Sequence, residues 1–127
     1  WRGHFYPERH PAKEMFGFYA SIFKTVEINF TFYQNPTVST VDGWLGQAPA
    51  GFIYGLKEPR RITHVKRLLD CAEPLTFFWE RVAPLGPSLG PILFQLPPTF
   101  RCSIERLQAF LTLLPPGLRP AFEFRHE

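Results

Sequence analysis

Glu123, Arg125 and His126 stand within four residues of one another at the end of the apolar segment "PAFEFRHE". A guanidinium group binds a carboxylate or phosphate through two parallel hydrogen bonds, and an imidazole exchanges protons near pH 7. We therefore predict Arg125 and His126 as substrate-binding residues and Glu123 as a catalytic carboxylate. The alternative is an internal Glu123–Arg125 ion pair beside a loop histidine, and His126 would face away from Arg125 if the strand continued.

Three more polar residues follow apolar segments in the same way, Glu27 and Asn29 in "TVEIN" and Lys57 at the end of "FIYGLK". Glu27 is a candidate general base, with Asn29 orienting the substrate. Lys57, if desolvated, is a candidate nucleophile or oxyanion partner. The alternative for the two charged residues is a buried ion pair between Glu27 and Lys57, or for Lys57 an ion pair with Glu123.

Two further residues are candidates for substrate binding. Gln95 in "FQLPP" offers a donor and an acceptor, and Tyr33 after "EINF" offers a ring for stacking on a sugar or a base. The alternatives are a hydrogen-bonding brace for Gln95 and packing over the rim for Tyr33. Arg60, Arg61 and His64 of "PRRITH" form a small basic segment, which suits either a phosphate group or a solvated loop.

The composition of the chain indicates which partners, which location and which kinds of site are expected. Lys plus Arg exceed Asp plus Glu by 14 to 11, giving a net charge of +3, which favours anionic partners without requiring nucleic acid. No apolar stretch approaches the roughly 20 residues that cross a bilayer, so we predict no membrane association. The two cysteines form no CxxC pair, which favours a cytoplasmic location. We predict no metal, and the sequence does not identify a cofactor.

Apolar patterning predicts four β-strands, each short, rich in branched or aromatic residues and bounded by Pro or Gly. They cover residues 25–29, 52–57, 91–96 and 121–125. Helical periodicity precedes and separates them. The helical segments are a stripe from Met15 to Val26 and the ranges 38–45, 74–82 and 103–114.

This alternation of helices and strands predicts an α/β fold with a parallel sheet and helical crossovers. Each strand becomes polar only towards its carboxyl end, as parallel sheets do where they form a ligand site. We call this end of the predicted sheet the mouth. The candidate residues are therefore expected to gather there.

Five motifs carry a resemblance that covers essentially the whole chain: "FYPE", "YASIFKTVEINFTFY", "PRRITH", "LGPILFQLPPTF" and "LPPGLRPAFEFRH". In order and spacing they closely resemble the YecE-like family, also called domain of unknown function 72. The resemblance implies a (β/α)8 barrel similar to a TIM barrel, of which roughly half, strands 2 to 5 with their helices, would be present. Residues 1–127 would then be one partial barrel domain, truncated at both ends. The family brings no established reaction.

The leading hypothesis is an enzyme that acts on a small anionic substrate, phosphorylated or sugar-like, at the mouth of the barrel. A nucleic-acid binding or processing barrel is the second hypothesis, based on the basic charge and the nearby aromatic residues. A non-catalytic scaffold with a structural polar network is the third. The truncated chain is also expected to self-associate, because its outer strands would leave backbone groups unpaired.

Overall fold

The computed structural model describes residues 1–126, and a four-stranded parallel sheet lies at their centre. The strands are β1 (Thr25–Ile28), β2 (Ile53–Lys57), β3 (Leu89–Gln95) and β4 (Pro120–Glu123). They lie side by side in the order of the sequence, and each neighbouring pair is parallel. Sequential parallel strands with helical crossovers form (β/α) barrels. The predicted α/β class is confirmed, and the sheet corresponds to part of such a barrel.

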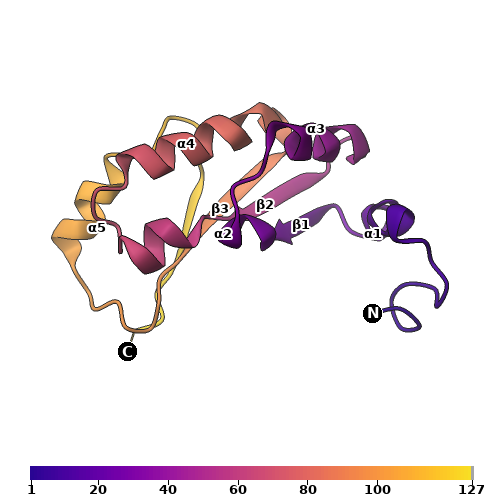
Figure 1. Ribbon diagram of the computed structural model, residues 1–127, viewed down its shortest axis with the longest axis horizontal. Helices are drawn as coiled ribbons and strands as arrows, with labels where there is room; N and C mark the ends of the chain where they lie inside the picture. Colours follow the sequence, from indigo (N-terminus) through magenta and orange to yellow (C-terminus); the bar gives the residue numbers. More distant parts are fainter. Residues whose placement is uncertain (127) are drawn as a thin grey trace.

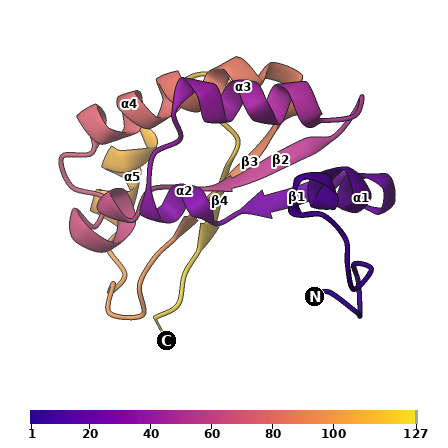
Figure 2. The same cartoon turned by 45° about the vertical axis from the view of Figure 1, so that its right-hand side comes forward.

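Four helices frame the sheet. They are α1 (Met15–Ile22) before β1, α3 (Val38–Gln47) between β1 and β2, α4 (Ala72–Val82) between β2 and β3, and α5 (Ile104–Leu111) between β3 and β4. Figures 1 and 2 show α3 and α4 side by side over one face of the sheet. The opposite face is the inner face of the corresponding barrel.

The hydrophobic core lies between the sheet and these helices. Along β2, Tyr54 and Leu56 are fully buried, whereas the alternate residues Ile53, Gly55 and Lys57 are only half-buried. This alternation follows from the period of two in a strand, which sends successive side chains to opposite faces. On β3, the buried Phe94 packs against Phe110 of α5 and Phe122 of β4, with ring centroids 5.3 and 5.2 Å apart. Each such side chain contributes about 1.5–3 kcal/mol on burial.

The stripe from Met15 to Val26 is not one helix. Helix α1 ends at Ile22, Phe23 is extended with φ −108° and ψ 146°, and Val26 belongs to β1 opposite Tyr54. The β-branched Thr25 and Val26 favour an extended backbone that packs on a sheet. The sequence prediction for this segment was wrong at its carboxyl end.

Several short helical segments were not predicted. They are η1 (Ala12–Glu14), α2 (Phe30–Tyr33), the single π turn η2 (Arg61–Val65) and η3 (Ala83–Ser88). Two of them matter for function, because α2 directly follows β1 and η2 follows β2. Both therefore stand at the mouth, the carboxyl end of the sheet.

Strands β2 and β3 leave no room for a side chain at Gly90. A Cβ atom there would lie 2.7 Å from Ile53 Cγ2 and 2.9 Å from the carbonyl oxygen of Tyr54. The register between the two strands also shifts between Tyr54 and Leu56. Glycine is therefore required by the space between two backbones at this point.

Within residues 1–126, no helix has the length and apolar character needed to span a membrane. Both cysteines are free thiols, Cys71 buried and Cys102 exposed. The cytoplasmic location stays a prediction.

Candidate functional site

Three polar side chains at the carboxyl ends of adjacent strands are joined by hydrogen bonds. Lys57 Nζ on β2 donates to Gln95 Oε1 on β3 at 2.7 Å, and Gln95 Nε2 donates to Glu123 Oε2 on β4 at 2.8 Å. The register places Gln95 directly opposite Glu123. Because side chains alternate along a strand, all three project from the inner face of the sheet.

Arg125 extends this row beyond β4. Its Nε lies 2.9 Å from Glu123 Oε1, and both side chains are partly exposed. The two oxygens of Glu123 are thus held by different partners, Gln95 and Arg125. The internal Glu–Arg ion pair considered as an alternative is present. We call the four connected residues Lys57, Gln95, Glu123 and Arg125 the mouth network; it contains two cations and one carboxylate.

Lys57 is fixed from two sides. Its ammonium nitrogen lies 4.5 Å from the ring centroid of Phe32 on α2, a cation–π contact. The buried hydroxyl of Thr31, also on α2, lies within hydrogen-bond distance of two backbone carbonyls, that of Lys57 and that of Ile28, the latter at 3.1 Å, and its one proton is available to either. The predicted alternative, an ion pair between Glu27 and Lys57, does not form within residues 1–126, because the Lys57 ammonium is directed to Gln95.

The other candidates on this side lie around the network without bonding to it. Glu27 is exposed on the inner face of β1, opposite Gly55. Asn29 is exposed and immediately precedes α2. Tyr33 is 75% exposed, and its ring packs edge-on against Phe32 at 5.1 Å between centroids. In the described part of the chain, none of the three is hydrogen bonded to the mouth network, and their roles stay predictions.

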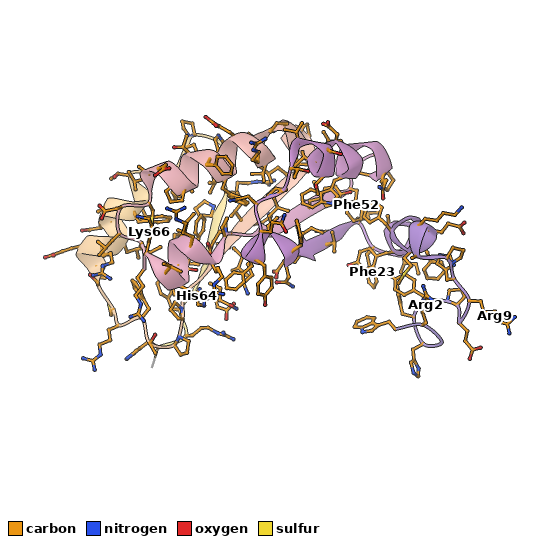
Figure 3. All side chains as sticks on the ribbon, in the orientation of Figure 1. Arg2, Arg9, Phe23, Phe52, His64 and Lys66 are labelled. Carbon is orange, nitrogen blue, oxygen red and sulfur yellow. The ribbon has the colours of Figure 1, made fainter. Side chains whose placement is uncertain are left out.

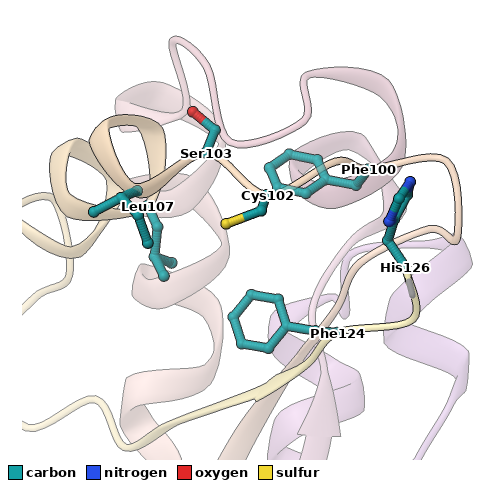
Figure 4. Close-up of a pocket in the computed structure, with 7 residues that line it drawn as sticks. Phe100, Cys102, Ser103, Leu107, Phe124 and His126 are labelled. Atoms are coloured by element: carbon teal, nitrogen blue, oxygen red, sulfur yellow. The ribbon is translucent and has the colours of Figure 1, made fainter.

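His126 lies beside a mainly apolar pocket (Figure 4). The pocket has a volume of about 470 Å³ and is formed by the segment before α5, by α5 itself and by the end of β4. Its lining residues are Phe100, Cys102, Ser103, Ile104, Leu107, Phe124 and His126. His126 is thus one of the residues that line this pocket, and its substrate-binding role stays a prediction.

The sequence analysis missed the most buried carboxyl group, Glu58, which directly follows Lys57. Its side chain is fully buried, and its Oε1 is 2.6 Å from the hydroxyl of Thr63 in η2. Burial raises the pKa of Glu58 to about 8, although the Thr63 hydrogen bond and the Lys57 charge act to lower it. A signal was available, because Glu58 continues the helix-facing series of Tyr54 and Leu56 in the period-two pattern.

Thr63 links Glu58 to His64. The Thr63 hydroxyl lies 2.8 Å from Nδ1 of His64, and the His64 ring packs edge-on against Phe32, with centroids 5.0 Å apart. Burial lowers the pKa of His64, and neighbouring cations lower it further. In decreasing order these cations are Lys57, Arg60, Arg125 and Arg67. The lowered pKa favours the neutral form of His64, which lies in a cationic environment.

Among residues 1–126, no three His, Cys, Asp or Glu side chains are grouped so that they could hold a metal ion. What the described side chains at the mouth do provide is a concentration of positive charge next to hydrogen-bonding groups. This arrangement suits an anionic ligand.

Comparison with known proteins gives the family. All of residues 1–127 match the family described as "Protein of unknown function DUF72". The chain belongs to the DUF72 family. This DUF72 chain is 36% identical over 109 residues to the UPF0759 protein YecE of Escherichia coli strain K12, in a match that covers 85% of the chain and 40% of YecE. The family resemblance seen in the sequence motifs is confirmed.

Two solved DUF72 structures share the fold of the DUF72 chain. The DUF72 family protein from Thermotoga maritima MSB8 matches with a TM-score of 0.79 and 30% identity, over 96% of this chain and 50% of that protein. The one from Enterococcus faecalis V583 matches with a TM-score of 0.71 and 29% identity, over 84% of this chain and 46% of that protein. The DUF72 chain thus spans half or less of the length of these relatives.

Proposed function

We propose that the mouth of the sheet binds a small anionic ligand, phosphorylated or sugar-like, and that the protein acts on it as an enzyme. The observation that carries this proposal is the mouth network. It holds Lys57 and Arg125 at the two ends of a hydrogen-bonded row across three adjacent strands. The carboxyl ends of parallel strands are where α/β folds bind their ligands.

The donors in this network favour an anion. An ammonium group has three N–H donors, and Lys57 uses one on Gln95. Arg125 contacts Glu123 through Nε, so its two terminal nitrogens remain as donors for a ligand. The network carries one more positive than negative charge, and its cations are positioned before a ligand arrives. Preorganised donors of this kind suit a phosphate or carboxylate group.

Each network residue has a distinct role in this proposal. Lys57 and Arg125 neutralise the ligand, Gln95 spaces Lys57 from Glu123, and Glu123 orients the Arg125 guanidinium. Glu123 was a candidate general base, but both its oxygens are engaged. Glu27, exposed on the inner face of β1, is the better-placed carboxylate for proton abstraction.

A thermal-shift panel on the intact protein tests the ligand class. The panel contains inorganic phosphate, a sugar phosphate, a small carboxylate, a neutral sugar and a short oligonucleotide. We expect phosphate and the sugar phosphate to raise the melting temperature, since a ligand that binds only the folded state stabilises it. Lys57→Gln and Arg125→Gln should each abolish this increase.

Matched control variants distinguish binding at the mouth from an effect of the protein's overall positive charge. Lys13→Gln and Arg9→Gln remove the same charges from exposed positions at the N-terminal end, and Figure 3 shows Arg9 well away from His64. Both should keep the phosphate response. An equal response in the mouth variants and the controls, or none in any protein, contradicts the proposal.

The oligonucleotide arm tests nucleic-acid binding as a second function. Its support is the exposed ring of Tyr33 on α2 together with the exposed Arg60 and Arg61, which follow β2. This function predicts stabilisation by the oligonucleotide that falls steeply with salt and has no counterpart with the small anions.

A further inference from the structure

A buried acid is connected to the mouth through one hydroxyl group. Glu58 Oε1 is 2.6 Å from Thr63 Oγ1, and Thr63 Oγ1 is 2.8 Å from His64 Nδ1. We propose that Glu58, Thr63 and His64 form a proton relay that transfers a proton between the buried Glu58 carboxyl group and Nε2 of His64 at the mouth. The mouth network contains none of these three residues.

The fold holds the relay in place. The backbone N–H of Glu58 donates to the Leu93 carbonyl of β3 at 3.0 Å, which continues the pairing of β2 with β3. Thr63 is fully buried, and the π turn η2 presents it and His64 together. Single π turns often occur at functional positions, because they redirect one side chain within a helical turn.

The hydroxyl of Thr63 sets the direction of the hydrogen bonds. It has one proton, so it can donate to only one neighbour while it accepts from the other. When Glu58 is protonated, its O–H donates to Thr63, and Thr63 donates to His64 Nδ1. Neutral His64 then carries its own proton on Nε2. The burial of Glu58 favours this state, because its Oε2 has no hydrogen-bond partner that would stabilise a carboxylate.

Proton release at the mouth reverses every bond in the row. The N–H bond at His64 Nε2 breaks as its proton passes to an anionic oxygen of the ligand, and Nδ1 takes the proton of Thr63. Thr63 in turn takes the proton of Glu58, which becomes a carboxylate. The ligand gains one proton and Glu58 loses one. Lys57, whose charge favours the ionised form of Glu58, stabilises the product state.

The groups around the imidazole keep it neutral. Lys57 from β2, Arg60 before η2, Arg67 after η2 and Arg125 after β4 all act on it electrostatically, and Phe32 of α2 packs edge-on against its ring. The positive charges disfavour an imidazolium. His64 therefore exchanges protons through the relay, as a neutral group with two tautomers. Its action on a ligand rests on the proposed function, whereas the relay itself does not.

Nitrogen NMR of the ligand-free intact protein tests the relay. Long-range proton–nitrogen spectra of protein labelled with ¹⁵N-histidine distinguish the two tautomers, and a His64→Gln variant assigns the signal. We expect His64 to carry its proton on Nε2 below about pH 8 and on Nδ1 above it, because Glu58 ionises near pH 8. A His64 tautomer that does not change between pH 6 and pH 10 overturns the proposal.

Three variants show whether the change passes through Thr63. Thr63→Val removes the hydroxyl at nearly constant volume and should abolish the change of tautomer, whereas Thr63→Ser retains the hydroxyl and should preserve it. Glu58→Gln cannot ionise and should keep the proton of neutral His64 on Nε2 throughout the range from pH 6 to pH 10. If Glu58→Gln does not fold, the comparison of Thr63→Val with Thr63→Ser is sufficient to test the relay. A change of tautomer that persists in Thr63→Val contradicts the relay.

This experiment is separable from the test of ligand binding. A protein that shows the tautomer change but no response to phosphate retains the relay and loses the proposed function. A protein that binds phosphate through Lys57 and Arg125 without a tautomer change retains the function and loses the relay.

Discussion

Glu58 is the residue whose ionisation should dominate the pH dependence of stability. Its pKa rises from an ordinary 4.5 to about 8 on folding, so between these values the folded state holds a proton that the unfolded chain has released. Stability should therefore decrease as pH rises from about 4.5 to 8, by on the order of 1.4 kcal/mol per pH unit from this group. Below about pH 4.5 both the folded and the unfolded chain hold this proton, so the contribution of Glu58 to stability is fully present.

Urea unfolding at pH 5, 6.5 and 8 measures this effect. The side chain of Glu58→Gln is neutral at every pH, so the stability of this variant should decrease less with pH. The difference in the free energy of unfolding between wild type and variant should therefore change by a few kcal/mol between pH 5 and pH 8. Parallel curves for the two proteins would show that Glu58 is ionised at pH 7 despite its burial.

For single residues, the sequence predicted which residues lie at the site better than it predicted which side chains they bond to. The period of two was enough to place Lys57, Gln95 and Glu123 at strand ends. It did not show that Lys57 turns to Gln95 instead of Glu27, since this depends on the stagger between strands and on the Phe32 ring. Glu58 was missed because the predicted strand ended at Lys57, one residue before it, so the period of two was not extended to Glu58.

At the scale of elements, the contact between β2 and β3 depends on Gly90. An alanine Cβ there would meet Ile53 Cγ2 at 2.7 Å and the Tyr54 carbonyl at 2.9 Å, and the backbone atom cannot move away cheaply. We expect Gly90→Ala to destabilise the protein by about 1–3 kcal/mol. Chemical denaturation of the intact protein measures this cost.

Gly43 provides the matched control for that substitution. It lies inside α3, with no atom within 4 Å of the position of its missing Cβ. Gly43→Ala should stabilise the protein by about 0.5–1 kcal/mol, because alanine is the better helix former. If Gly90→Ala is as harmless as Gly43→Ala, the two strands do not pack as closely as described.

All four predicted strands are present in the structure. They could be predicted because short runs of branched and aromatic residues are distinctive. The prediction failed for α2 and η2, which are single turns of four and five residues. Periodicity needs a longer segment to be recognised. These two turns nevertheless bring Phe32, Thr63 and His64 to the mouth. The scaffold was therefore more predictable than the parts that complete the site.

At the scale of the whole molecule, the four-stranded sheet has two outer strands, β1 and β4. Large apolar side chains are exposed near them, including Phe124 at 60% and Ile22 at 53%. The 127 residues expressed alone should therefore self-associate through unpaired strand edges and these side chains. Sedimentation velocity across a range of concentrations measures this, and a monomer that melts cooperatively at all of them contradicts it.

Lys57 and Arg125 are proposed to form an anion site at the mouth. The most direct measurement is a calorimetric titration of the intact protein with inorganic phosphate, repeated with Lys57→Gln, Arg125→Gln and the Arg9→Gln control. We expect each mouth variant to weaken phosphate binding by at least about tenfold, or roughly 1.4 kcal/mol, while the control binds like wild type. Unchanged phosphate affinity in both mouth variants would contradict it.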